Sequence, residues 1–165
     1  MIALQPRRGD KMSRAFVKEQ DFDTSADLPD RQISQHPNDV TSEGLAQIDA
    51  ALMAARAALA RSRMTNDRAA AAAASRDLRY WNARRTTARV IPNSRDATRV
   101  HFGSVVTIRR DDDREQTFRI VGEDEADPSN GSISYVSPLA KALLGKSVGE
   151  EVKAGNHDAL IQDIQ

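Results

Sequence analysis

The sequence predicts an α+β protein in which an antiparallel helical hairpin precedes an antiparallel β-sheet with one short helix. Apolar residues recur at alternating steps of three and four between residues 45 and 59, and again between 71 and 88, which is the spacing of one helix face. From residue 100 onward, short runs rich in Val and Ile alternate with turn-forming residues, as in an antiparallel sheet. We therefore expect a hairpin at 41–91, a linker at 92–98 and a β domain at 99–165.

The first forty residues form an arm with a different composition. They mix charges and prolines with few large apolar side chains. Such a segment buries too little apolar surface to offset the conformational entropy lost on ordering. We expect residues 1–40 to be mostly disordered.

Two helices are expected in the hairpin. Thr41 or Ser42 suits the N-cap of the first helix, and Asn66 or Asp67 suits that of the second. Each helix has about 20 residues and is about 30 Å long, so the short connection between them requires an antiparallel arrangement. The apolar seams that would pack together are Leu45, Ile48, Leu52, Ala55 and Leu59 on the first helix, and Ala71, Ala74, Leu78, Trp81 and Ala88 on the second.

The β domain is expected to begin with two strands, at residues 100–108 and 117–121, joined by a turn at 111–113. Asn130-Gly131 predicts a tight turn before a strand at 133–136. Ser137-Pro138 then predicts a helix through Leu144, because serine is a good N-cap and proline favours the first helical position. The last strands are expected at 148–152 and 159–164.

Composition excludes several functional classes. The 24 Lys and Arg balance the 24 Asp and Glu, so no global charge predicts attraction to nucleic acid or membrane. There is no cysteine, which excludes disulfides, thiolate catalysis and cysteine zinc sites. No apolar run approaches the roughly 18–20 residues that a membrane span requires, and the N-terminus lacks a signal-peptide pattern. We expect a cytoplasmic monomer with no membrane contact and no large catalytic cavity.

The hairpin nevertheless concentrates positive charge. Between Glu43 and Arg89 there are nine arginines and four acidic residues, and nine minus four leaves a net charge of +5. A solvated helix face explains such a pattern, and so does contact with an acidic protein or a nucleic-acid surface.

No sequence motif indicates catalysis or a bound metal. Gly145-Lys146-Ser147 resembles the end of a phosphate-binding loop, but Ala140 stands where that motif needs glycine. The acids at 111–113 and 123–127 lack the alternate spacing of a calcium loop, so solvated loop acids are the better interpretation. The three histidines are far apart, and no nucleophile elbow is present. We expect no catalytic residue, no metal site and no cofactor of the protein's own.

Four segments of the β domain together resemble the C-terminal domain of the bacterial GreA/GreB transcript-cleavage factors. They are V-x-F-G-S-x-V-T at 100–107, I-V-G-E-D-E-A-D-P at 120–128, I-S-Y-V-S-P-L-A-K-A-L-L-G-K at 133–146 and V-G-E at 148–150. The stretch M-S-R-A-F-V-K-E at 12–19 also resembles the start of GreB-type proteins. The resemblance implies an FKBP-like fold for the β domain and binding to core RNA polymerase at the rim of its secondary channel.

The resemblance also implies the residues that would bind the polymerase. The loop at Ser137 and Pro138, with Val136 and Leu139 beside it, matches the family's polymerase-contacting loop. The acidic loop that contains Asp124 and Glu125 matches a second family segment. In this family the hairpin enters the channel, where two acidic residues at its tip help to hold a magnesium ion that belongs to the polymerase active site. Contact with nucleic acid would be indirect, within the elongation complex.

The expected hairpin tip departs from the family pattern. It contains Arg61, Arg63, Asn66, Asp67 and Arg68, so a single carboxylate lies among three arginines whose charge repels a divalent cation. The hairpin is also expected to be shorter than in the cleavage-competent members of the family. The sequence therefore predicts a Gre-like regulator of elongation, similar to Rnk-type or non-cleaving members, that does not itself act as an enzyme.

Three alternatives remain open at this point. The first is a true cleavage factor that uses Asp67, alone or with an acid from elsewhere. The second is a prolyl isomerase, which an FKBP-like fold allows, although the domain offers few aromatic residues for an apolar pocket. The third is a DNA-binding module, which the arginine-rich hairpin favours but no recognition motif supports.

Overall fold

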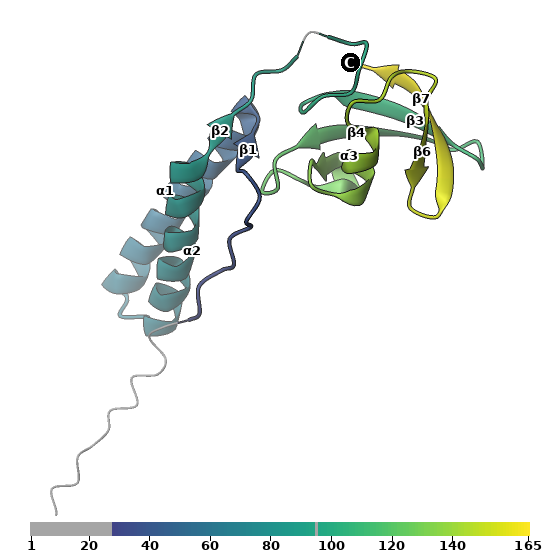
Figure 1. The fold of residues 1–165 in the computed structure, drawn as a ribbon. Helices are drawn as coiled ribbons and strands as arrows, with labels where there is room; N and C mark the ends of the chain where they lie inside the picture. Colours follow the sequence, from purple (N-terminus) through teal and green to yellow (C-terminus); the bar gives the residue numbers. More distant parts are fainter. Residues whose placement is uncertain (1–27, 95) are drawn as a thin grey trace, which may run out of the picture.

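The structure is a computed structural model that describes residues 28–94 and 96–165, and it is an α+β fold as expected. A helical hairpin and a β domain lie next to each other and give the molecule an elongated outline (Figure 1). The expected resemblance at residues 12–19, and the first 27 residues of the expected arm, lie outside the described residues. No helix in the described part of the chain is long and apolar enough to cross a membrane.

The hairpin consists of α1 (Ser42–Met64) and α2 (Arg68–Thr87). Thr41 caps α1 by accepting a hydrogen bond from the backbone N–H of Gly44, and Asp67 caps α2 by accepting one from Ala70. Both caps are among the residues expected from the sequence. The α1 seam is buried at Ile48, Leu52 and Ala55.

At its base the hairpin is closed by a small parallel pair of strands, β1 (Asp39–Val40) and β2 (Arg89–Val90). This pair corrects the expected boundary of the arm, because the described residues before 41 are placed against the hairpin. Residues 28–38 run beside α2 from near the tip to β1 at the base (Figure 1). Asp30 pairs with Arg79 at 2.6 Å, and the Arg31 guanidinium lies 3.7 Å from the ring centre of Tyr80. These contacts with α2 hold the segment in place. An argument from composition alone does not include such contacts.

The β domain contains a five-stranded sheet in the order β5-β4-β3-β7-β6. Its elements are β3 (Val105–Arg110), β4 (Glu115–Val121), the 3-10 turn η1 (Pro128–Asn130), β5 (Ser132–Ser134), α3 (Pro138–Leu143), β6 (Glu151–Ala154) and β7 (His157–Ile164). All the neighbouring strands are antiparallel except β4 and β5, which are parallel.

The parallel pair corrects the expectation of a purely antiparallel sheet. Asn130-Gly131 does form a tight turn, with Gly131 at a φ of 78°. However, this turn ends η1 instead of joining two paired strands. The chain between β4 and β5 first passes through the acidic loop at 122–127, which reverses its course, so that β5 enters the sheet in the same direction as β4.

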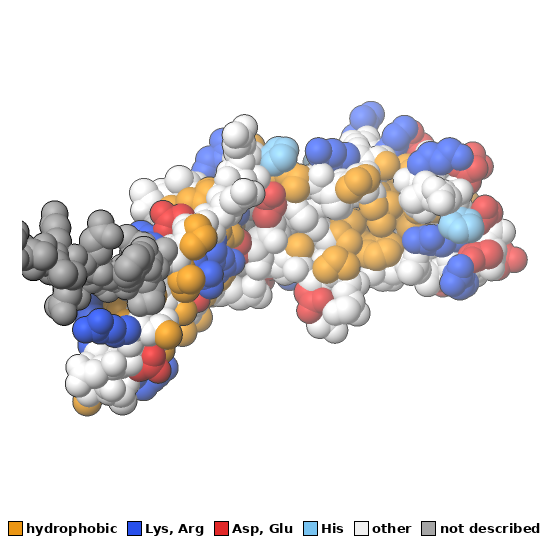
Figure 2. All heavy atoms as spheres, turned by 90° about the horizontal axis from the view of Figure 1, so that it is seen from below, with side chains coloured by type: hydrophobic (Ala, Val, Ile, Leu, Met, Phe, Trp, Pro, Cys, Tyr) orange, Lys and Arg blue, Asp and Glu red, His pale blue; other side chains and the backbone are white. Residues whose placement is uncertain are grey.

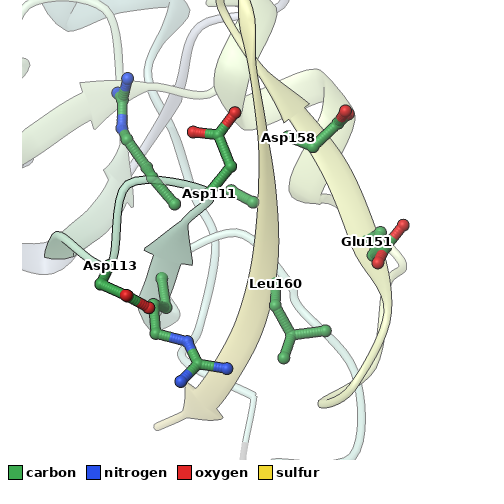
Figure 3. Close-up of a pocket in the computed structure, with 8 residues that line it drawn as sticks. Asp111, Asp113, Glu151, Asp158 and Leu160 are labelled. Atoms are coloured by element: carbon green, nitrogen blue, oxygen red, sulfur yellow. The ribbon is translucent and has the colours of Figure 1, made fainter.

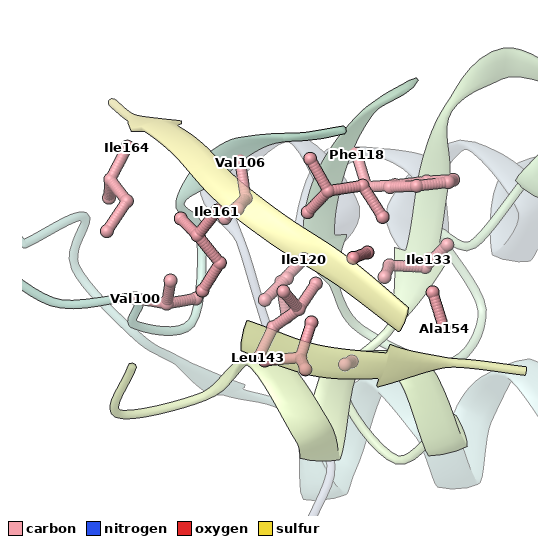
Figure 4. Close-up of a cluster of buried hydrophobic side chains, with 13 residues drawn as sticks. Val100, Val106, Phe118, Ile120, Ile133, Leu143, Ala154, Ile161 and Ile164 are labelled. Carbon is pink, nitrogen blue, oxygen red and sulfur yellow. The ribbon is translucent and has the colours of Figure 1, made fainter. Parts of the chain in front are cut away.

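The core of the domain lies between the sheet and α3 (Figure 4). Val106, Ile108, Ile120 and Ile161 point into it from the strands, and Leu143 from α3, each with 0% exposure. Val100 is also buried, but it lies before β3. Its backbone forms hydrogen bonds with Gly145 and Lys146 in the turn after α3, and not with a strand of the sheet. The expected strand at 100–108 therefore begins at Val105, and the one expected at 148–152 begins at Glu151.

Candidate functional site

The first part of the candidate site is the segment that leads into α3. Ser137 caps this helix by accepting a hydrogen bond from the Ala140 N–H at 3.2 Å, and Pro138 occupies the first turn. Pro138 is exposed, while Val136 and Leu139 are half-buried on either side of it. The Ser137 N–H donates to the Ser134 carbonyl at 2.9 Å. The sequence-predicted residues at 136–139 therefore lie together on a rigid, partly apolar edge of the domain.

The acidic loop that follows β4 turns toward the hairpin. Asp124 accepts hydrogen bonds from the Tyr80 hydroxyl at 2.5 Å and from the Arg84 guanidinium. The side chains of Arg84 and Asp124 are only 2% and 12% exposed. Charged groups buried this deeply must be paired, since each loses its hydration. The ion pair therefore fixes the β domain to α2.

A second contact fixes the same loop to the start of α1. The Thr41 hydroxyl donates to the Glu125 carboxylate, with oxygen-to-oxygen distances of 2.7 and 2.8 Å. The same hydroxyl oxygen accepts the capping hydrogen bond from Gly44, so one side chain caps α1 and also holds the β domain. A Cβ on Gly44 would lie 2.4 Å from a Glu125 carboxylate oxygen, and this position therefore suits glycine.

Burial also changes the ionisation of Tyr80. Loss of hydration, and next the hydrogen bond to the Asp124 carboxylate, raise the pKa of Tyr80 to about 12. The neutral phenol is the form that can donate this hydrogen bond. Tyr80 therefore remains a donor to Asp124 throughout the physiological pH range.

We call the contacts between the hairpin and the acidic loop the joint. Asn38, in the segment before β1, adds further hydrogen bonds next to it. Its side-chain amide donates to the Arg84 carbonyl at 2.7 Å and lies 3.2 Å from the Thr87 hydroxyl. The hydroxyl of Tyr135, in the segment before α3, donates to the Pro37 carbonyl. The joint therefore links the hairpin, the segment before it and the candidate edge at 136–139.

The second part of the candidate site is the hairpin tip. Asn66 has a φ of 52°, which lets the chain reverse between the helices. An Asp67 carboxylate oxygen accepts from the Ala70 N–H at 2.9 Å, and the Asp67 N–H donates to the Ser62 carbonyl. The five tip residues expected from the sequence, Arg61, Arg63, Asn66, Asp67 and Arg68, are all exposed. The one tip carboxylate therefore already serves as a helix cap.

The acidic residues elsewhere do not gather into a metal site. Within residues 28–94 and 96–165, no three His, Cys, Asp or Glu are placed to share an ion. A depression of about 250 Å³ lies between the β3–β4 and β6–β7 turns, and the carboxylates of Asp111, Asp113, Glu151 and Asp158 around it point in different directions (Figure 3). Two of these acids have partners, because Asp158 pairs with Lys153 at 2.6 Å and Asp111 with His157 at 3.1 Å.

Comparison with known proteins shows which family the β domain resembles. Residues 95–159 match the family model described as "Transcription elongation factor, GreA/GreB, C-term". The β domain is similar to the C-terminal domain of the GreA/GreB family, and we call it the GreA/GreB domain. This result confirms the resemblance of the β domain, and the resemblance at residues 12–19 stays a prediction.

Curated relatives match this GreA/GreB domain at substantial identity. The GreB of Neisseria meningitidis serogroup B is 46% identical over 79 residues, which are 47% of this chain and 48% of the relative. The GreA of Hyphomonas neptunium is 53% identical over 57 residues, which are 34% of this chain and 36% of the relative. The chain thus spans half or less of the length of these relatives.

Solved structures of named Gre factors resemble the chain only loosely. The GreA factor homolog 1 of Thermus thermophilus covers 79% of this chain and 99% of its own, at 19% identity and a TM-score of 0.39. A GreA/GreB factor from Nitrosomonas europaea covers 77% and 98%, at 20% identity and a TM-score of 0.39.

The geometry divides the predicted polymerase-binding residues into two groups. Val136, Ser137, Pro138 and Leu139 lie together at one edge of the GreA/GreB domain, whereas Asp124 and Glu125 face the hairpin. Sequence reasoning missed Tyr80 and Arg84 as partners of the acidic loop. The available signal was the position of Arg84, three residues after Trp81 on the seam face of α2, where a charged residue needs a buried partner.

Proposed function

We propose that the protein is a regulator of transcription elongation that binds core RNA polymerase through the edge formed by Val136, Ser137, Pro138 and Leu139. The observation that carries the proposal is the GreA/GreB family match over residues 95–159. The exposed Pro138, beside half-buried apolar side chains on a capped helix, supports this edge as the contact. Rigid partly apolar surfaces bind with little loss of conformational entropy.

The second half of the proposal is that the hairpin enters the rim of the polymerase secondary channel without efficiently stimulating transcript cleavage. Cleavage by a two-metal mechanism needs carboxylates that offset the charge of the cations. The tip offers Asp67 alone, and one of its oxygens already accepts a backbone hydrogen bond. Arg61, Arg63 and Arg68 further disfavour a nearby divalent cation. Any magnesium would belong to the polymerase.

Affinity capture tests the docking edge. Wild-type protein should retain core RNA polymerase, and Pro138→Asp should retain much less, because it places a charge in the apolar contact. Aspartate is tolerated in the first turn of a helix, so α3 should still form. Gln116→Glu is the matched control, since it adds the same charge at an exposed position of β4. Equal retention by wild type and Pro138→Asp would show that this edge is not the contact.

A cleavage assay on backtracked polymerase tests the second half. With magnesium present, the protein should release little 3′ RNA above the intrinsic level of the polymerase. Asp67→Asn is the informative variant, because asparagine keeps the helix cap but removes the charge. Strong release of RNA by wild type that Asp67→Asn abolishes would instead establish a cleavage factor that uses Asp67.

A further inference from the structure

The outer face of α1 carries an exposed apolar stripe. The seam residues Ile48, Leu52 and Ala55 are buried against α2. On the opposite side of the helix, side chains at steps of three and four are all exposed, namely Ala46, Ala50, Met53, Ala57, Ala60 and Met64. We call these residues the outer stripe. Met53 and Met64 are 69% and 84% exposed, higher fractions than those of the other exposed large hydrophobic residues described.

A helix that is apolar on two faces usually packs on both of them. The seam satisfies one face of α1, and no described residue buries the outer stripe. Methionine is flexible and polarisable, and it is common at surfaces that adapt to a partner. The outer stripe therefore has the composition of a contact surface.

Arginines border the outer stripe. By helical geometry, Arg56 and Arg63 lie along one side of it and Arg61 along the other. Arg56, Arg61, Arg63 and Arg68 form no ion pair with any residue of the described chain, whereas five arginines nearer the base pair with acids: Arg76, Arg79, Arg84, Arg85 and Arg89. Blue and orange side chains are accordingly mixed over the hairpin (Figure 2). Among the residues that the structure describes, arginines without an ion-pair partner are therefore concentrated beside the stripe.

The combination favours a protein partner over a nucleic acid. Methionine and arginine are enriched in protein–protein contacts, and lysine is depleted there. The hairpin, residues 41–91, contains no lysine at all. Phosphate backbones are bound by lysine as well as arginine, and they offer no apolar surface for exposed methionines.

From this geometry we infer that the outer stripe and its flanking arginines bind an acidic protein surface with apolar side chains in reach of Met53 and Met64. The inference rests on the proposed function, which makes core RNA polymerase the protein that supplies this surface. The contact is separate from the edge at 136–139, because it lies on α1, with Met53 in the middle of that helix and Met64 at its tip end. It gives the hairpin an affinity of its own for the partner.

Binding of the labelled full chain to core RNA polymerase tests the inference. The Met53→Gln/Met64→Gln and Arg56→Gln/Arg63→Gln variants should each bind about tenfold more weakly, since loss of a central contact costs about 1–2 kcal/mol. Glutamine is a good helix former, so the hairpin should persist, which circular dichroism checks. Arg79→Gln/Arg85→Gln removes the same charge from arginines that have partners, and it should stay within about twofold of wild type.

The possible results separate this inference from the proposed function. If wild type binds and both stripe variants bind equally well, the inference is wrong and the proposed docking edge stands. If wild type does not bind the polymerase, both fail. If the arginine variant alone loses affinity, and loses it equally for a single-stranded RNA probe, the stripe is a nucleic-acid surface instead. If sedimentation shows that wild type is a dimer and that the methionine variant is a monomer, the stripe binds a second copy of this chain instead.

Discussion

The Arg84 guanidinium of α2 and the Asp124 carboxylate of the acidic loop form an ion pair that is almost fully buried between the hairpin and the GreA/GreB domain. Removing one partner of such a pair leaves a buried charge uncompensated. Arg84→Met and Asp124→Asn should therefore each lower the free energy of unfolding by about 3–5 kcal/mol. Urea denaturation followed by circular dichroism measures this loss.

Arg85→Gln provides the control for this prediction. Arg85 pairs with Asp49 at 2.5 Å, but both side chains are almost half exposed. Exposed pairs contribute at most about 1 kcal/mol, so this variant should unfold close to wild type. The double variant Arg84→Met/Asp124→Asn should lose less than the sum of the two single losses, because neither charge remains alone. Strict additivity would contradict the pairing.

Stability at alkaline pH should depend on Tyr80. Its pKa is raised from 10.0 to about 12, so the folded state holds this proton more tightly than the unfolded state. The resulting stabilisation is fully present below pH 10 and is lost as the pH rises through about 12. Urea denaturation at increasing pH should show a steeper loss for wild type than for Tyr80→Phe. Tyr135, whose pKa is raised as well, is common to both proteins. Parallel losses would show that Tyr80 has no such role.

Gly122 should tolerate no larger residue. A Cβ at this position would lie 2.7 Å from the backbone oxygen of Asp39 in β1, and backbone cannot move aside as a side-chain end can. Gly122→Ala should cost about 1–3 kcal/mol, the usual range for overpacking. Gly44→Ala is the comparison, because its Cβ would meet the end of the Glu125 side chain, which can move aside only by weakening its hydrogen bond from Thr41. The better helix propensity of alanine, about 1 kcal/mol, should offset part of that cost, so Gly44→Ala should lose less stability than Gly122→Ala. Thermal unfolding of the two variants compares them directly, and equal losses would contradict this difference.

The sequence could predict the features that depend on local chemistry. Local chemistry within three residues predicted a helix cap at Thr41 or Ser42, at Asn66 or Asp67 and at Ser137, and the caps are found at Thr41, Asp67 and Ser137. Asn130-Gly131 predicted a turn correctly, because glycine permits positive φ, but a turn does not determine which strands pair. The joint between Arg84 and Asp124 spans 40 positions of sequence. It depends on how two elements dock, and no local pattern contains that information.

The segment before β1 should lie less closely against Trp81 when Arg31 is replaced. The Arg31 guanidinium lies 3.7 Å from the ring centre of Tyr80 and 5.2 Å from that of Trp81, and it pairs with Asp77 at 3.5 Å. Cation–π contacts of this kind contribute about 0.5–1 kcal/mol when exposed. Trp81 is the only tryptophan, so the fluorescence reports the surroundings of this one side chain. Arg31→Gln should make Trp81 more accessible to a neutral quencher such as acrylamide. Arg85→Gln, which leaves the segment in place, should not change the quenching. Unchanged quenching in Arg31→Gln would mean that Arg31 does not shield Trp81 in solution.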